Sequence, residues 1–335
     1  MILKDRKDIR KNELIKAKSI NRELPVNYVA KDNNLFEGIL TDRFDAVNIY
    51  SIDHVYILKD TLFKSYNLLH TYTHMEGLPF KSRIKRLALF LFKRENIEKG
   101  IWVINNWSAG YFHWLIDVIP KLLISKQHMN GHKVLLPSLY RKYKFIGDSL
   151  TRLEFDFIYY NELRKNKVEE LLLVDKLRYC DPEIMCKVRE EFIKDESYNK
   201  TPDKRIYISR SKARIRKIVN EAEVIEVLLQ YGFEIHHFEA YDLDQQIKIM
   251  HSCKYFISIH GAGLTNMLFM NRGTKVLEFR KEGDALNGCY YSLANSLKID
   301  YYYLLCKATN ESTQLADFFV DVQFLRETLK IMINE

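Results

Sequence analysis

The segment ISIHGAGLTN at residues 257–266 combines residue types that can hold a phosphate group. Its alternating apolar residues end at His260, which predicts a buried strand, and Gly261 and Gly263 follow at once. Glycine can take a positive φ and lets a ligand come close to the backbone. A helix that begins here would point its free N–H groups at that ligand. We therefore predict a diphosphate site, with a tight turn that binds nothing as the alternative.

Other candidate groups lie in and around this turn. Thr265 and Asn266 are placed to cap the helix amides or to bind the ligand, and Glu278 ends the next predicted strand, where a carboxylate can accept hydrogen bonds from a ribose. Arg210 ends the predicted strand RIYISR, and its planar fork suits phosphate oxygens. The complete set of residues predicted to bind this ligand is Arg210, Arg216, Lys217, His260, Gly261, Ala262, Gly263, Leu264, Thr265, Asn266 and Glu278.

The segment NNWSAGYFHWLIDVIP at residues 105–120 contains a second group of reactive side chains. His113 and Asp117 are four residues apart and share one face of a predicted helix, in which Pro120 marks a kink or a break. A histidine beside a carboxylate can serve as a general base with an orienting partner. We expect Asp117 to take the proton and His113 to orient it, with His113 as the alternative base. The alternative is that the two residues are purely structural, as a helix cap and a buried core histidine.

Two further patterns are weaker indications of a cofactor. Asp242 and Asp244 form a DLD pair, but Asp242 is better placed to cap the following helix, and we expect no metal. The turn has Asn266 where a dinucleotide-binding fingerprint requires its third glycine, which argues against a nicotinamide cofactor. The five cysteines include no CxxC pair and are expected to be free thiols.

Alternating strands and helices must position these groups. The chain of 335 residues is long enough for two domains, and both halves alternate strands with helices, which predicts α/β domains with parallel sheets. We place a first domain at residues 1–198 and a second, ligand-binding domain at residues 199–314, with a polar linker at 196–204. The apolar stretch at residues 315–335 is expected to form a helix that packs back on the first domain.

Three motifs, YFHWLIDVIP, YISRSKARIRKIVNEAEVIEVL and ISIHGAGLTNMLFM with VLEF, resemble glycosyltransferase family 61 in order and spacing. The resemblance covers about residues 100–305. It implies a GT-B fold with two Rossmann-like domains facing across a cleft, and inverting, metal-independent transfer from a nucleotide sugar, commonly UDP-linked. By this resemblance the glycine turn holds the diphosphate, Glu278 the ribose, and Arg210 with either Arg216 or Lys217 the phosphates. His113 and Asp117 match the family's H-x-x-x-D pattern.

Charge and hydropathy limit the partners. A formal net charge of +8 favours anionic partners, but no nucleic-acid-binding signature is present and we expect no nucleic acid. The charged N-terminus does not read as a signal peptide, and no apolar run approaches the roughly 20 residues of a membrane span, so we expect a cytoplasmic protein. The basic and apolar segment at residues 81–94 predicts either a buried helix or peripheral contact with an anionic membrane.

The sequence thus favours a glycosyltransferase that acts on a glycan or lipid-linked glycan acceptor in surface polysaccharide synthesis. Two alternatives stay open. One is a nucleotide-binding regulatory or scaffold homologue without transferase activity, and the other is a Rossmann oxidoreductase.

Overall fold

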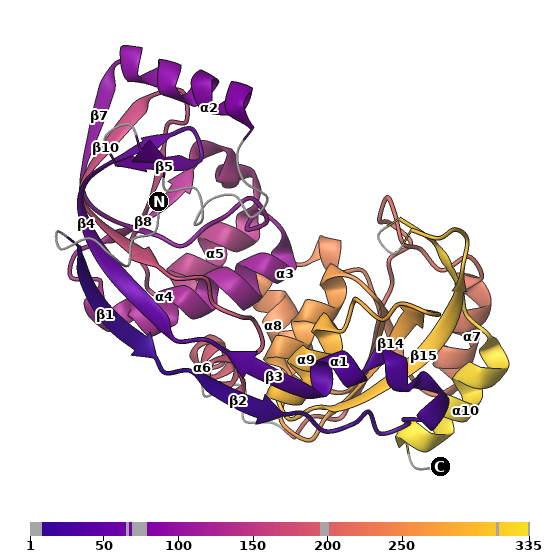
Figure 1. The fold of residues 1–335 in the computed structure, drawn as a ribbon. Helices are drawn as coiled ribbons and strands as arrows, with labels where there is room; N and C mark the ends of the chain where they lie inside the picture. Colours follow the sequence, from indigo (N-terminus) through magenta and orange to yellow (C-terminus); the bar gives the residue numbers. More distant parts are fainter. Residues whose placement is uncertain (1–8, 65–66, 69–78, 195–200, 313–314, 334–335) are drawn as a thin grey trace. The chain divides into compact units, whose positions relative to one another are not determined.

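The computed structural model describes residues 9–64, 67–68, 79–194, 201–312 and 315–333, which form two compact units (Figure 1). Unit 1 comprises Met1–Lys18 and Phe44–Tyr179, and unit 2 comprises Ser19–Arg43 and Cys180–Glu335. The predicted boundary therefore differs from the structure, because residues 19–43 and 180–194 pack with the second unit. The linker expected at residues 196–204 lies partly outside the described residues.

Unit 1 is built on a mixed sheet of eight strands in the order β6-β5-β4-β10-β7-β8-β9, with β1 paired to β4. Strands β10, β7, β8 and β9 run parallel to one another, whereas β1, β4, β5 and β6 pair antiparallel. The strands are β1 (Arg10–Ile15), β4 (Val47–Leu58), β5 (Thr61–Lys64), β6 (Asn67–Leu68), β7 (Arg94–Trp102), β8 (Lys133–Pro137), β9 (Phe157–Tyr160) and β10 (Lys165–Val174).

The helices of unit 1 follow the strands that they connect. They are α2 (Phe80–Leu87), the 3₁₀ turn η4 (Ala88–Leu91), α3 (Tyr111–His113), the π-helical turn η5 (Trp114–Val118), α4 (Ile119–Ser125), the 3₁₀ turns η6 (Lys126–His128) and η7 (Ser138–Lys142), and α5 (Lys144–Arg152). The continuous helix α3-η5-α4 buries most of its apolar side chains, including Trp114, Ile116 and Leu122, so it is fixed in position after β7. This helix carries the predicted pair of reactive side chains.

Unit 2 is built on a sheet in the order β12-β11-β13-β14-β15-β16. The first five strands are parallel, as the sequence predicts, and β16 pairs antiparallel. The strands are β11 (Lys204–Ile208), β12 (Glu234–His236), β13 (Cys253–Ile259), β14 (Lys275–Lys281), β15 (Asp300–Ala308) and β16 (Phe318–Phe319). The strand order reverses between β11 and β13, and in open α/β sheets ligands bind at the carboxyl ends of strands at such a point.

The remaining elements of unit 2 surround this sheet. They are β2 (Lys18–Asn21), the 3₁₀ turn η2 (Ala30–Leu35), α1 (Glu37–Leu40), β3 (Thr41–Phe44), α6 (Pro182–Phe192), α7 (Glu221–Gln230), the 3₁₀ turn η9 (Phe238–Ala240), α8 (Leu243–His251), the 3₁₀ helix η10 (Ala262–Phe269), α9 (Cys289–Ser296) and α10 (Val322–Ile333). Strands β2 and β3 pair as a separate two-stranded ribbon. Both units are thus mixed helix and sheet, which confirms the α/β class.

The N-terminal insertion of unit 2 is anchored by one buried arginine. The Arg22 guanidinium donates to Asp42 Oδ2 at 2.8 and 3.2 Å, to the Ser292 carbonyl at 3.0 Å and to the Cys180 carbonyl at 3.0 Å. A buried cation is tolerated only with such a complete set of partners. These contacts explain why residues 19–43, predicted in the first domain, belong to the second.

The C-terminal helix α10 also belongs to unit 2. Its buried residues Leu325, Leu329 and Met332 pack in the same core as Val224 of α7 and Tyr302 of β15. The expectation that it packs on the first domain is therefore wrong, because its apolar face is covered by its own sheet. Within the described residues, no helix has the length and apolarity needed to cross a membrane.

Candidate active site

The helix that follows β7 carries the His113–Asp117 pair in an irregular segment. Pro120, the second residue of α4, has no N–H group, and its ring crowds the carbonyl four residues earlier. The preceding turn, Trp114–Val118, is π-helical, and π turns are frequent at functional sites. The kink or break predicted at Pro120 thus takes the form of this wider turn, within which Asp117 lies.

The two side chains meet as the spacing predicts. His113 Nδ1 lies 2.7 Å from Asp117 Oδ2. The histidine side chain is 33% exposed and the carboxylate 13%, so the carboxylate lies behind the ring. Trp107 and Phe112 flank the imidazole at ring-centroid distances of 5.6 and 5.4 Å. With Nδ1 engaged by the carboxylate, Nε2 is the ring nitrogen left to meet a substrate.

A buried lysine lies on the inner side of this pair. Lys121 is 6% exposed, and its ammonium donates to the Val103 carbonyl at 3.3 Å. Burial lowers the pKa of Lys121, and the Asp117 charge opposes that shift in part. Asp117 Oδ1 is buried without a hydrogen-bond partner in the described residues. The carboxylate thus interacts with the charge of Lys121 and, through Oδ2, with the His113 imidazole.

In unit 2, the predicted glycine turn lies at the point where the strand order reverses. Arg210 follows β11 and Gly261 follows β13, and these strands are neighbours in the sheet. The guanidinium lies directly over the glycine, since a methyl group on Gly261 would be 2.9 Å from Arg210 Nη1. The bare backbone therefore makes room for a cation at the carboxyl end of β13.

Backbone carbonyls hold the Arg210 side chain. Its Nε donates to the Arg216 carbonyl at 3.2 Å and its Nη2 to the Ile215 carbonyl at 3.3 Å. Burial lowers the pKa of Arg210, and the nearby Arg216 charge lowers it further. Two cations in one partly buried place favour an anionic ligand. Lys217 is engaged differently, because its backbone bonds to Asp317 and Phe318.

His260 is the other polar side chain at this strand end, and a buried carboxylate fixes it. His260 Nδ1 lies 2.5 Å from Glu278 Oε1, and Tyr301 Oη donates to Glu278 Oε2 at 2.5 Å. Glu278 is completely buried within β14, which continues to Lys281. The structure therefore does not agree with a direct contact between Glu278 and a ribose, because the buried carboxylate can affect a ligand only by orienting His260.

The glycine turn differs from the prediction in its backbone. Neither Gly261, with a φ of 162°, nor Gly263 lies in the positive-φ region that favours glycine. A methyl group on Gly263 would meet Ile208 Cγ2 at 3.4 Å, which is close but ordinary contact. Close packing thus requires glycine at position 261, beneath the Arg210 guanidinium, and neither position requires a special backbone angle.

The remaining residues of the predicted motif turn inward. Leu264, Thr265 and Asn266 are buried in the 3₁₀ helix η10, and Asn266 Nδ2 donates to the Gly263 carbonyl at 3.0 Å. Ala262 and Gly263 are the partly exposed members of this segment. The partly exposed groups of this site are therefore Arg210, Arg216, Ala262 and Gly263, whereas Gly261 is buried and the His260 side chain is only 9% exposed.

The DLD pair has the structural role that its spacing favours. Asp242 caps α8, its side chain accepts from the Gln245 N–H at 2.8 Å, and Gln245 returns a bond to the Asp242 N–H. Within the described ranges, no group of three or more His, Cys, Asp or Glu side chains could hold a metal ion. The five cysteines are free thiols, as predicted.

Sequence reasoning missed the aromatic groups around His260. The Tyr290 ring lies 5.0 Å from the His260 ring, and Tyr301 bonds to Glu278. Burial, with the Glu278 charge, raises the pKa of Tyr301 well above its usual value, so it is a neutral donor. Tyr301 is the first tyrosine of the predicted strand DYYYLLC, but the alternation of residues alone could not show which of the three tyrosines faces Glu278.

Comparison with known proteins places these residues in one family. Residues 111–277 match the glycosyltransferase 61 family. Over 102 residues the chain is similar to the EGF domain-specific O-linked N-acetylglucosamine transferases of Bos taurus, Gallus gallus and Mus musculus, with 31%, 30% and 31% identity. The similar region is 29% of this chain and 19% of each relative, so the match spans about a fifth of the relatives' length.

Proposed function

Because the chain belongs to glycosyltransferase family 61, we propose that it transfers a sugar from a nucleotide sugar, UDP-linked, to a hydroxyl group of a glycan or lipid-linked glycan acceptor. The proposal includes inversion at the anomeric carbon, the GT-B arrangement and action on the cytoplasmic side in surface polysaccharide synthesis. It treats the two groups of residues as half-sites, each described within its own unit.

One observation carries the proposal, namely the Arg210 guanidinium placed over Gly261 at the reversal point of a doubly wound sheet. An anionic leaving group there would meet two guanidinium groups and the His260 ring. Preorganised cations of this kind stabilise the charge that develops on a departing diphosphate. A binding homologue would leave the half-buried His113–Asp117 pair without a chemical role, whereas an oxidoreductase could also use such a pair, so the family match is what favours sugar transfer.

The reaction needs a base as well as a cationic site. In the proposed step, the acceptor hydroxyl gives its proton to His113 Nε2 while its oxygen forms a bond to the anomeric carbon. The bond from that carbon to the diphosphate breaks, and the diphosphate leaves with the electron pair toward Arg210 and Arg216. Asp117 then stabilises the imidazolium, as a carboxylate behind a histidine does in other acid–base sites.

This assignment reverses the roles expected from the sequence. The histidine is the more exposed partner and has a ring nitrogen available, whereas the carboxylate binds the far side of the ring. An imidazole can also accept and release a proton near neutral pH. Both residues keep a function, with His113 as the base and Asp117 as the group that orients it.

The test of the proposal measures donor binding and donor hydrolysis. Arg210→Ala should weaken binding of UDP-glucose or UDP-N-acetylglucosamine at least tenfold, because a charge-assisted phosphate contact contributes roughly 1.5–3 kcal/mol. Titration calorimetry gives the affinity, and release of UDP in the absence of an acceptor gives the hydrolysis rate. If wild-type protein neither binds nor hydrolyses any of a panel of nucleotide sugars, the proposal fails.

Gly261→Ala and Gly263→Ala make a matched pair for the same assay. The first should displace the Arg210 guanidinium and weaken donor binding, whereas the second should have a smaller effect because its methyl group meets only ordinary contacts. Equal behaviour of the two variants would show that the guanidinium position is unimportant. In the proposed step the cations replace a metal, so treatment with EDTA should leave hydrolysis unchanged.

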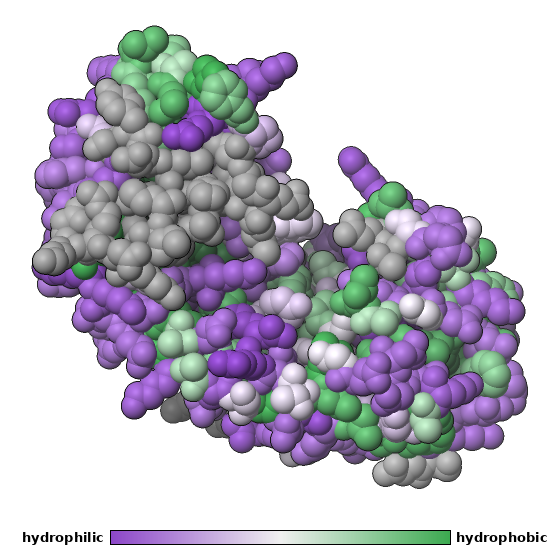
Figure 2. All heavy atoms as spheres, in the orientation of Figure 1, coloured by the Kyte–Doolittle hydropathy of each residue, from purple (hydrophilic) through white to green (hydrophobic). Residues whose placement is uncertain are grey.

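We also propose that unit 1 docks on an anionic membrane through α2 and the residues that follow it. Phe80, Ile84, Leu91 and Phe92 are exposed there beside the exposed cations Lys81, Lys85, Lys93 and Arg94. Figure 2 shows hydrophobic side chains gathered over this helix, with hydrophilic ones beside them. Apolar groups that can enter the headgroup layer, combined with cations, favour an anionic lipid surface.

Sedimentation with phosphatidylglycerol vesicles tests this surface. Leu91→Ser should reduce binding, whereas Leu286→Ser should not, although the two leucines are 89% and 93% exposed. The difference arises because Leu286 lies outside the cluster. Equal binding of both variants and wild type would contradict the membrane proposal.

A further inference from the structure

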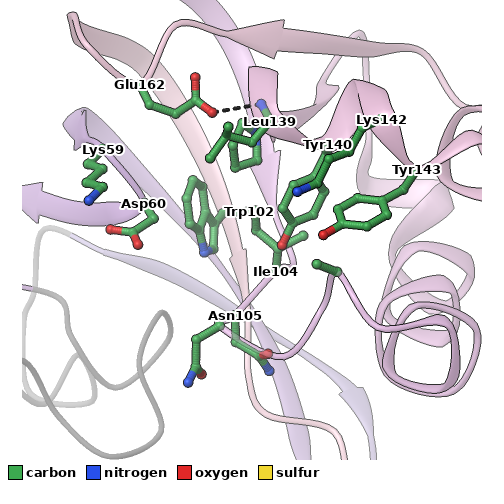
Figure 3. Close-up of a pocket in the computed structure, with 13 residues that line it drawn as sticks. Lys59, Asp60, Trp102, Ile104, Asn105, Leu139, Tyr140, Lys142, Tyr143 and Glu162 are labelled. Atoms are coloured by element: carbon green, nitrogen blue, oxygen red, sulfur yellow. Dashed lines mark hydrogen bonds between the residues drawn. The ribbon is translucent and has the colours of Figure 1, made fainter. Parts of the chain in front are cut away.

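Unit 1 contains a cavity of about 260 Å³ that the sequence did not reveal (Figure 3). Its lining comes from four segments, namely the end of β7 with the turn that follows it, the end of β8 with η7, the turn between β4 and β5, and Glu162 in the turn between β9 and β10. Typical small-molecule sites measure about 300–1,000 Å³. The cavity is therefore large enough for a single ring but not for a whole nucleotide sugar.

Aromatic side chains form two walls of this cavity. Trp102 is 1% exposed and stacks on Tyr160, with ring centroids 6.2 Å apart. Tyr140 and Tyr143 lie edge to face at 6.1 Å on the other wall, and in Figure 3 both hydroxyl groups point toward the space between the walls. Such walls offer flat apolar faces with polar ends.

The wall that carries the tyrosines is held rigidly. Glu162 accepts hydrogen bonds from Ser138 Oγ and from the Leu139 N–H, the latter at 2.8 Å, which pins η7 to the end of β9. Asp60, on the opposite side, is bound by the Arg86 guanidinium at 2.6 and 2.9 Å. The two carboxylates are thus engaged by the protein itself, so the cavity is not built for a cationic ligand.

Hydrogen-bond donors remain for a ligand that fills the cavity. Trp102 Nε1 is buried without an acceptor in the described part of the chain, and Figure 3 shows it on the side of the ring that faces Asp60 and Asn105. A buried donor without a partner costs about 1–3 kcal/mol, which a ligand oxygen would recover. The exposed Asn106 amide and Lys142 ammonium add donors at the rim.

We propose that this cavity binds one pyranose ring of the acceptor glycan. A sugar ring has apolar C–H faces for the aromatic walls and hydroxyl oxygens for the indole, amide and ammonium donors. The lining contains no arginine, which separates it from the diphosphate-binding groups of unit 2. This inference rests on the proposed function, because it names the substrate class for the half-site that contains the base.

The cavity and the base share one turn of the chain. Asn105, Asn106 and Ala109 line the cavity, while Trp107 in the same turn contacts the His113 ring at 5.6 Å. Asn105 Oδ1 fixes this turn by accepting from the Trp107 N–H at 2.8 Å. A sugar ring in the cavity would therefore place the next part of the glycan beside the turn that precedes His113.

The experiment uses p-nitrophenyl β-glucoside, β-galactoside, β-N-acetylglucosaminide and β-xyloside as probes of the whole protein. Binding is measured by saturation-transfer NMR, with UDP as a further probe. Tyr143→Ala should weaken binding of the preferred glycoside at least fivefold. Tyr159→Ala is the matched control, because each tyrosine is half-buried and has a cation over its ring, Lys142 for Tyr143 and Arg141 for Tyr159.

Trp102→Phe, which removes the indole N–H, should likewise weaken binding, and Asn106→Ala provides a test at an exposed position that cannot upset the core. None of these variants should change UDP release from the donor alone. The inference is overturned if no glycoside binds the wild type, if Tyr143→Ala and Asn106→Ala both bind like the control, or if UDP is the ligand that Tyr143→Ala loses. If the wild-type protein binds a glycoside but hydrolyses no nucleotide sugar, the proposed function is contradicted, whereas the glycoside-binding cavity is not.

Discussion

The two units each contain a histidine paired with a carboxylate, in very different surroundings. His113 and Asp117 lie one helical turn apart in unit 1, with side chains 33% and 13% exposed. His260 and Glu278 of unit 2 lie on neighbouring strands, with side chains 9% and 0% exposed. The first pair is open to a substrate on one side, whereas the second is enclosed and shares its carboxylate with Tyr301.

This difference shows that the pair alone does not decide the chemistry. A histidine must reach the hydroxyl from which it takes a proton, and of these two histidines His113 has the more exposed ring. The buried pair instead fixes the direction of the His260 ring beneath the glycine turn, because every polar atom of Glu278 is engaged. Under the proposed function, this difference in exposure separates a pair that transfers a proton from a pair that positions a ring.

The largest effect is expected from removing the exposed imidazole. His113→Gln should lower kcat by roughly 10²–10⁴-fold, the usual contribution of a positioned base. Donor affinity should stay near the wild-type value, since the change lies in unit 1. Steady-state kinetics with a nucleotide sugar and the preferred glycoside give both quantities.

Asp117→Asn is the companion variant. An amide oxygen can still accept from His113 Nδ1–H, but the charge that stabilises the imidazolium is lost, so turnover should fall less than in His113→Gln. If Asp117→Asn is the more damaging change and His113→Gln keeps more than a tenth of the activity, the carboxylate is the base, as the sequence alone suggests.

A stability effect of intermediate size is expected in the buried pair. Glu278→Gln replaces one acceptor oxygen by an amide donor, so either the His260 Nδ1–H or the Tyr301 O–H loses its acceptor. An unsatisfied buried polar group costs about 1–3 kcal/mol in the free energy of unfolding. Urea denaturation should show this loss in Glu278→Gln and little change in Asp117→Asn. Equal stability of both variants would remove the distinction between the pairs.

The smallest effect concerns the lysine behind the exposed pair. Burial lowers the pKa of Lys121 below its unfolded value of 10.5, so between the folded and unfolded pKa values the unfolded chain binds more protons. The free energy of unfolding should therefore rise with pH through that window, relative to Lys121→Met. Exposed Lys126→Met serves as the control, and the same slope in both variants would contradict the assignment.

The sequence by itself determined the local features of the protein. The spacing of His113 and Asp117 placed both on one helix face because an α-helix repeats every 3.6 residues, and the structure brings them to 2.7 Å. The parallel sheet of unit 2 followed from alternating strands and helices, and the role of Asp242 followed from capping geometry. The family motifs were recognisable because they are short and contiguous.

Tertiary structure decided everything that depends on contacts between distant segments. Only the register of β14 and β15 could show that Glu278 is sealed under His260 and Tyr301 instead of facing a ribose. Residues 19–43 belong to unit 2 because Arg22 binds partners up to 274 positions away in the sequence. Helix α10 packs on unit 2 because the sheet of that unit has an apolar face that the helix covers. The aromatic cavity likewise assembles from four separate segments of unit 1. Local spacing fixes which residues share a face, but burial depends on which other surfaces come to cover that face.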